Sequence, residues 1–186
     1  MSIKWKEQKK DLEFFPLEKL YSKISFCESI PIMLKEIQVW FENKCQREIN
    51  SHLLSSKKEL GGLLIGSVYS NNDNNFNYGL IHIKESVEST EFSSSGVSLT
   101  MSPDVWNSAN KISDNKNYVI GWYHSHPNLG AFFSGTDKYT QKNFFPNTYN
   151  LGLVIDPFNN EQKIYISKDS REIQKENISI VQNGVA

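Results

Sequence analysis

The sequence has little cysteine, no long apolar run and no excess of either charge. Cys27 and Cys45 are its two cysteines among 186 residues and form no CxxC pair, so we expect neither a disulfide framework nor a cysteine-rich zinc site. No run of about 18 apolar residues occurs, so no membrane-spanning segment and no membrane partner are expected. The formal net charge of −1 provides no overall attraction to nucleic acid, which is therefore not expected as a partner either.

Composition indicates one globular domain, since 38% of the residues are hydrophobic and 22% are charged. The first residues are charged and lack the apolar core of a signal peptide, so the expected location is the cytoplasm. We expect residues 1–19 to form a charged lead-in, residues 20–168 to form the domain, and residues 169–186 to be a polar tail that adds one strand at 178–181.

Apolar patterns predict strands and helices that are mixed without regular alternation. Strands are expected over 21–26, 59–70, 77–87, 97–100, 118–126, 149–157, 162–168 and 178–181, and helices over 30–54, 102–112 and 134–145. The first helix is predicted from the spacing of Ile30, Met33, Leu34, Ile37 and Phe41, which is close to 3.6 residues. Residues 59–70 and 77–87 should form a hairpin, and residues 89–96 a polar connection. These elements favour an α/β sandwich around a mixed sheet.

The stretch HSHPNLGAFFSGTD, residues 124–137, contains two of the four histidines. Alternation along a strand places His124 and His126 on the same face, and Pro127 then ends the strand. Asp137 begins a helix, and the intervening loop is long enough to return its carboxylate to the histidines. Two imidazoles and one carboxylate would leave the fourth position of a tetrahedral zinc open for water, as in catalytic zinc sites.

A hydrolytic zinc site also needs a base, because zinc-bound water, with a pKa of roughly 7, must still lose its proton to a nearby group. Glu59 is the best candidate, since it begins an apolar strand where a buried carboxylate without a partner or a function would be costly. Ser134 lies one helical turn before Asp137, and its hydroxyl could donate to the oxyanion of a tetrahedral intermediate.

Each of these features also has an ordinary structural explanation. The histidine pair by itself is weak evidence for a metal, Ser134 and Asp137 fit a helix cap, and Glu59 fits a solvated carboxylate before a strand. Glu85, Glu88 and Glu91 are rival bases in a polar stretch. The other histidines, His52 and His82, are expected at the surface or in structural hydrogen bonds, and Trp122 and Tyr123 in the core.

Taken together, these residues resemble the JAMM family of zinc isopeptidases, the catalytic branch of the MPN-domain proteins. The matching residues are a glutamate in ELGGLLIG, the histidines and proline of YVIGWYHSHP, and the spaced serine and aspartate; GLVIDP is similar too. The resemblance implies a single MPN domain with the cytidine-deaminase-like α-β-α sandwich, a mixed, curved sheet and flanking helices. It further implies one zinc held by His124, His126 and Asp137, with Glu59 as acid/base and Ser134 as oxyanion donor.

The resemblance also implies hydrolysis of isopeptide or peptide bonds after the C-terminal tail of a ubiquitin-like protein. The connections at 89–97 and 145–150 are short, so the chain is most similar to compact prokaryotic members. Some of these act with E1-like and E2-like enzymes in bacterial conjugation systems, including antiphage systems. Processing of a sulfur-carrier protein or its cysteine adduct, a non-catalytic MPN scaffold, and hydrolysis of small amides are the alternatives.

Overall fold

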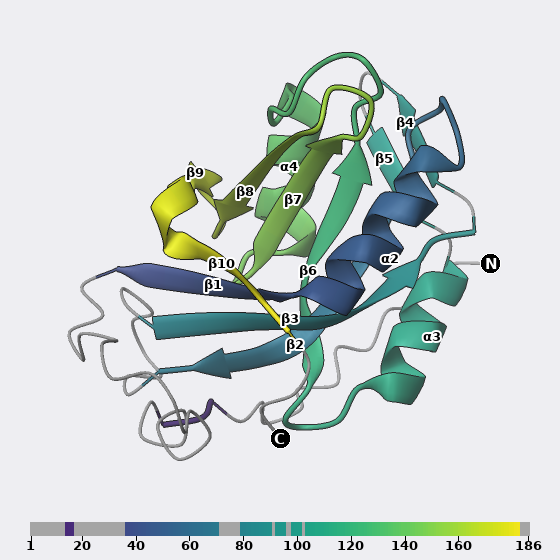
Figure 1. The fold of residues 1–186 in the computed structure, drawn as a ribbon. Coiled ribbons are helices and arrows are strands. Elements are labelled where there is room, and N and C mark those ends of the chain that lie inside the picture. The colour runs from purple at the N-terminus through teal and green to yellow at the C-terminus, as the bar shows by residue number, and fades with distance from the viewer. Residues whose placement is uncertain are drawn as a thin grey trace.

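A curled, mixed β-sheet is the centre of the computed structural model, which describes residues 14–16, 36–70, 79–90, 92–95, 98–101 and 103–182 (Figure 1). Within these residues the sheet has eight strands in the order β10-β1-β3-β2-β6-β7-β8-β9, and β4 and β5 form a separate pair. The strands are β1 (Ile37–Glu42), β2 (Gly61–Tyr69), β3 (Gly79–Glu88), β4 (Phe92–Ser95), β5 (Ser98–Met101), β6 (Tyr118–Ser125), β7 (Leu151–Asp156), β8 (Glu161–Ile166), β9 (Arg171–Glu172) and β10 (Ile178–Val181). The helices are α2 (Asn43–Leu54), α3 (Pro103–Ile112), α4 (Gly135–Phe144) and the short 3-10 helix η1 (Lys175–Asn177).

Strand β2 lies in the middle of the sheet, and all nine of its residues are buried. It pairs antiparallel with β3 on one side and with β6 on the other. Alternate residues of β2 face opposite sides, so Leu64 packs in one apolar core while Leu63 packs in another. Both faces of the sheet are therefore covered.

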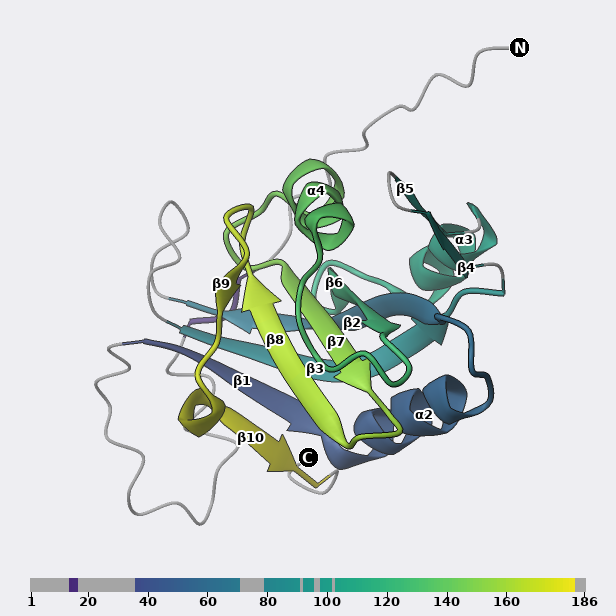
Figure 2. The same cartoon turned by 90° about the horizontal axis from the view of Figure 1, so that it is seen from above.

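The α-helices α2, α3 and α4 divide between these two faces. Helix α2 contributes Cys45, Ile49 and Leu53 to the first core, and α3 contributes Val105 and Ala109 to the second. Figure 2 shows α2 on one side of the sheet and α3 and α4 on the other. This arrangement confirms the expected α/β fold with a mixed, curved sheet and flanking helices.

The helix expected over 30–54 is wrong for residues 37–42, which form β1 between β10 and β3. Ile37 and Phe41 fit a helical spacing, but together with Val39 they also alternate, and that shorter period decides the structure. Parallel pairing on both sides stabilises the strand, and the helix begins only at Asn43. Residues 30–35 lie outside the described part of the chain.

The other expected elements that fall within the described residues are present, with small shifts at their ends. The hairpin is β2–β3, and the last expected strand, 178–181, is β10, which pairs parallel with β1. The expected polar connection over 89–96 contains a strand, β4, paired with β5. The strand expected at 21–26 and most of the expected lead-in lie outside the described residues, so the domain boundaries stay predictions. No described helix is long and apolar enough to cross a bilayer.

Candidate metal and catalytic site

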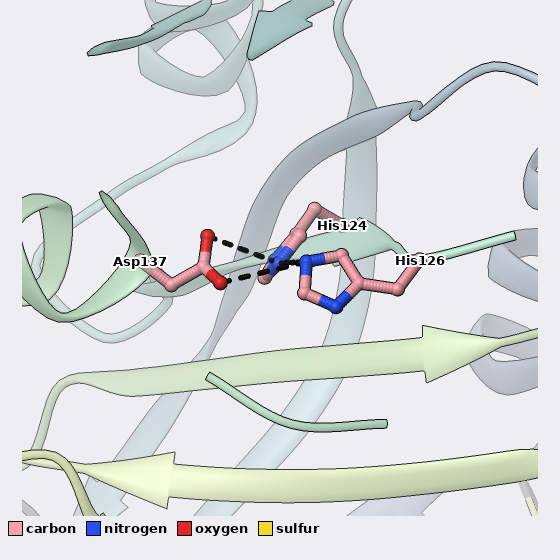
Figure 3. A group of neighbouring side chains, drawn as sticks. All are labelled: His124, His126 and Asp137. Atoms are coloured by element: carbon pink, nitrogen blue, oxygen red, sulfur yellow. Dashed lines mark hydrogen bonds and ion pairs between the residues drawn. The ribbon is translucent and has the colours of Figure 1, made fainter. Parts of the chain in front are cut away.

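His124, His126 and Asp137 converge at the end of β6, and all three are buried. His124 belongs to β6, His126 follows it directly, and Asp137 lies in the first turn of α4. The two imidazole Nε2 atoms lie 3.1 Å apart. The Asp137 carboxylate oxygens lie 3.2 Å from Nε2 of His124 and 3.5 Å from Nε2 of His126, and Figure 3 shows the three side chains facing one another.

These distances fit a tetrahedral metal site. Ligand atoms about 2.0–2.1 Å from a tetrahedral zinc lie about 3.3 Å from one another, because that is the edge of the tetrahedron. The two nitrogens are 3.1 Å apart, and each lies at a similar distance from its nearer carboxylate oxygen, Oδ1 at 3.2 Å for His124 and Oδ2 at 3.5 Å for His126. Two nitrogens and one carboxylate oxygen are also ligands that zinc accepts. Among the described residues, His124, His126 and Asp137 are the group of three or more side chains that the fold brings close enough to hold a metal ion.

Asp137 is held by the helix cap that the sequence suggested. The backbone N–H of Ser134 donates to Oδ2 of Asp137 at 2.7 Å, and the N–H of Asp137 donates to the Ser134 hydroxyl at 3.2 Å. This capping box fixes the carboxylate while leaving Oδ1 directed at His124. The cap and the metal site are therefore compatible uses of the same residues.

The charge on Asp137 is favoured by its surroundings. Burial alone would raise the pKa of this carboxyl, but hydrogen bonds with the two histidines and with Ser134 outweigh that effect. The pKa therefore lies well below its ordinary value, and Asp137 is ionised at neutral pH. A buried anion beside two imidazole nitrogens is an electrostatically suitable place for a cation.

Trp122 and Gln141 support the site from behind, a role that no pattern in the sequence predicts for them. The Trp122 ring stacks on the His124 ring, with centroids 4.6 Å apart and planes at 9°. Its indole N–H donates to the Gln141 side-chain oxygen at 2.7 Å, and the Gln141 amide donates to the carbonyl of Asn150 at 2.9 Å. Because Gln141 is one turn after Asp137 on α4, this contact links the helix that carries the carboxylate to the strand that carries the histidines.

Glu59 lies just before β2, at the level of His126. Gly61 is paired with His124, and the Leu60 carbonyl accepts from the Ser125 N–H at 2.9 Å, so the antiparallel register continues beyond the strand. Directly opposed residues point to the same face, and Glu59 is two positions before Gly61. The register therefore places Glu59 on the face of the two histidines, and its side chain is only partly buried.

The same register separates Glu59 from a rival base. Glu88 is paired with Gly62, which is paired with Tyr123, so it belongs to the opposite face of the sheet. There its charge acts on two buried groups: burial lowers the pKa of His52, which Glu88 partly offsets, and burial raises the pKa of Tyr123, to which Glu88 adds. Glu85 is exposed on β3, and Glu91 lies outside the described residues.

His52 and His82 are in structural contacts, as expected. His52 Nδ1 lies 3.0 Å from the Tyr123 hydroxyl, and His82 Nε2 lies 2.8 Å from a Glu42 oxygen. Neither histidine belongs to the metal-ligand group.

Fold and site together define a class: a single α/β domain in which two histidines after a central strand meet an aspartate at a helix start. The chain belongs to the Prok-JAB family, described as prokaryotic homologs of the JAB domain, whose family model matches residues 42–158. The sequence-based resemblance to JAMM/MPN proteins, in their compact prokaryotic form, is thereby confirmed.

Curated relatives match over short segments. The chain is 48% identical over 40 residues to "Ubiquitin carboxyl-terminal hydrolase RPN11" of Saccharomyces cerevisiae, covering 21% of this chain and 13% of that protein. It is 45% identical over 47 residues to "COP9 signalosome complex subunit 5" of Debaryomyces hansenii, covering 24% of this chain and 10% of that protein. The chain thus spans only a small part of either relative.

A solved structure supports the fold alone. Protein DSY2949 from Desulfitobacterium hafniense superposes with a TM-score of 0.58 at 21% identity, over 78% of this chain and 94% of that one.

Proposed function

We propose that this protein is a zinc-dependent isopeptidase or peptidase that hydrolyses the bond after the C-terminal tail of a ubiquitin-like protein. The observation that carries the proposal is the convergence of His124, His126 and Asp137, with Glu59 on the same face of the sheet. Membership in the JAB family and the short match to a ubiquitin carboxyl-terminal hydrolase support the reaction class.

Zinc is the proposed metal because its tetrahedral geometry agrees with the ligand separations in the site. His124 and His126 would each bind through Nε2, and Asp137 through the carboxylate that Ser134 holds. A zinc ion with three protein ligands lowers the pKa of a bound water to about 7 and polarises a carbonyl oxygen.

Glu59 is the proposed general base and acid. Its carboxylate would accept a proton from the attacking water as the water oxygen bonds to the carbonyl carbon. The same proton would then pass to the amine nitrogen as the C–N bond breaks, which gives a free carboxylate and a free amine. A side chain that is only partly buried suits this role, because it can reach a substrate.

Ser134 is the proposed oxyanion donor. Its hydroxyl oxygen accepts the Asp137 N–H, so its own proton is available to donate to the tetrahedral oxyanion. The residue is only partly buried at the start of α4, next to the ligand carboxylate.

The proposed substrates are conjugates or precursors of a ubiquitin-like protein. The family model describes prokaryotic homologs. We therefore propose a place in a bacterial ubiquitin-like conjugation system, including an antiphage one, with E1-like and E2-like enzymes as partners in the cytoplasm. Processing of a sulfur-carrier protein or its cysteine adduct is the second candidate, since it uses the same site residues.

The proposal is tested with two fluorogenic substrates, ubiquitin and a sulfur-carrier protein, each joined through its C-terminal glycine to aminomethylcoumarin. We expect release of the fluorophore from at least one of them, with loss on chelation and recovery on adding zinc. The preferred substrate distinguishes the two candidates. Zinc-loaded protein that cleaves neither would contradict the proposed reaction and favour a non-catalytic scaffold.

A further inference from the structure

The carboxylate of Asp156, at the end of β7, is fully buried and gathers hydrogen bonds from two loops. On one side, the backbone N–H groups of Asn128 and Gly130 donate to it at 3.1 and 2.8 Å. On the other side, the N–H groups of Phe158 and Asn159 donate at 3.1 and 3.2 Å, and the Asn159 side-chain amide donates at 2.7 Å. One carboxylate therefore joins the loop after β6 to the turn after β7.

The loop held in this way begins at a metal-ligand residue. Asn128 and Gly130 follow His126 by two and four positions, and the His126 N–H donates to the Ile155 carbonyl at 2.9 Å. His126 lies beyond the end of β6, so the strand ladder alone does not fix its backbone. The His126 backbone is held by its N–H bond to Ile155, and Asp156 holds the loop that follows it.

The loop also has a backbone conformation that needs support. Asn128 has φ of 61° and Gly130 has φ of 86°, both in the left-handed region. Within this loop, these two residues are the ones whose N–H groups donate to Asp156. Glycine adopts such a φ readily, but Asn128 does so at a cost, and without an acceptor at Asp156 the loop would lose the hydrogen bonds that offset it.

The charge of Asp156 matters for this role. Burial alone would raise the pKa of the carboxyl, but the hydrogen bonds from Gly130, Asn159 and Asn128 outweigh it and lower the pKa to about 2. The group is therefore ionised at neutral pH. All five of its partners are N–H donors, so an amide NH₂ in its place would face donors on several sides.

We infer that Asp156 is a positioning residue for the metal site: its carboxylate fixes the loop that orients His126, without touching the metal or the substrate. This inference rests on the proposed function only in requiring that His124, His126 and Asp137 bind a metal. Its consequence is that metal affinity and coordination geometry should depend on a residue beyond the ligands themselves.

The test compares Asp156→Asn with Asp114→Asn in the full chain. Asp114 is a matched control, because it accepts the N–H groups of Lys116 and Asn117 at 2.7 and 2.6 Å in a turn before β6, at the opposite end of that strand from the histidines. Zinc affinity is measured by competition with a chromophoric chelator, and the visible absorption of the cobalt-substituted protein reports coordination geometry.

We expect Asp156→Asn to bind zinc about 10- to 100-fold more weakly, as for other changes behind metal ligands, and to lower the intensity of the tetrahedral cobalt bands. Asp114→Asn should keep the affinity and the spectrum of the unsubstituted protein. Equal zinc affinity and spectra in all three proteins would overturn the inference. An unsubstituted protein that binds neither metal would instead overturn the proposed function.

A milder variant covers the case in which Asp156→Asn does not fold. Asn159→Ala removes the 2.7 Å side-chain hydrogen bond to Asp156 and leaves every backbone donor in place. Loss of this one bond is expected to weaken zinc binding about three- to tenfold. Unchanged affinity and cobalt absorption in this variant would overturn the inference.

Discussion

Two contacts between a histidine and a carboxylate in the described part of the chain differ in ways that explain the metal site. In one, His82 Nε2 lies 2.8 Å from Glu42 on neighbouring strands. In the other, His124 Nε2 lies 3.2 Å from Asp137. The shorter contact belongs to the pair without a third ligand, so proximity of an imidazole and a carboxylate does not by itself make a metal site.

The two carboxyl groups have opposite pKa shifts. Burial raises the pKa of Glu42, with Lys84 partly offsetting this, whereas the histidines and Ser134 lower the pKa of Asp137 despite its burial. Glu42 Oε2 has no hydrogen-bond partner among the described residues, whereas Asp137 Oδ2 accepts the Ser134 N–H. A metal site therefore needs a second imidazole and a carboxylate whose charge the fold has already stabilised.

The largest expected effect comes from replacing the carboxylate of each histidine–carboxylate pair with the corresponding amide. Asp137→Asn should reduce zinc content from about one per chain to a small fraction and abolish hydrolysis, because the amide is a poor zinc ligand. Its side-chain oxygen can still accept the Ser134 N–H, so the helix cap can remain. Glu42→Gln is the matched control and should keep full zinc content, measured by elemental analysis of protein purified without chelator. Equal zinc in both variants would mean that the metal lies elsewhere.

The next largest effect concerns Glu59, the proposed base, which has no counterpart at the His82–Glu42 pair. Glu59→Gln should lower kcat by about 10²- to 10⁴-fold while zinc content stays unchanged, because proton transfer is lost but the ligands remain. Glu88→Gln, at the same end of the β2–β3 hairpin but on the opposite face, should be fully active. If Glu59→Gln retained its activity, the assignment of the base would be wrong.

A smaller effect is expected from the support behind His124. Gln141→Leu removes the acceptor of the Trp122 indole and should weaken zinc affinity about tenfold, as for changes to other groups that orient metal ligands. Gln46→Leu makes the same substitution on α2, where the side chain is partly exposed, and should leave zinc affinity unchanged. Chelator competition measures both variants, and a shared loss of affinity would show that the effect is not local to α4.

The smallest effect is a pH dependence of stability at Glu42. Its folded-state pKa is raised, so the folded chain binds more protons than the unfolded chain just above pH 4.5, and stability falls as the pH rises through that window. Glu42→Gln mimics the protonated form and should gain up to about 1 kcal/mol relative to the unsubstituted protein between pH 4 and pH 7. Urea unfolding across this range measures the difference; a relative loss toward pH 7 would show that ionised Glu42 stabilises the fold.

Much of the site could be predicted from the sequence, because its residues lie in short segments with clear local patterns. The strand that carries His124, the turn at Pro127 and the cap at Ser134 follow from alternation, proline chemistry and capping preferences. The first helix was placed too early because Ile37 and Phe41 satisfy a period of 3.6 and a period of 2. Only pairing with β3 and β10 selects the strand there.

The sequence by itself determined the chemical identity of the site: two histidines on one face, an aspartate at a helix start, and a glutamate before an apolar strand. The tertiary structure decided which glutamate shares that face, because the β2–β6 register, continued to Glu59, gives it the face of the histidines, whereas Glu88 has the opposite face. It also decided what holds the ligands. The hydrogen bond from Trp122 to Gln141 and the hydrogen bonds from the loop after β6 to Asp156 join segments far apart in the chain, and such contacts depend on packing rather than on local sequence.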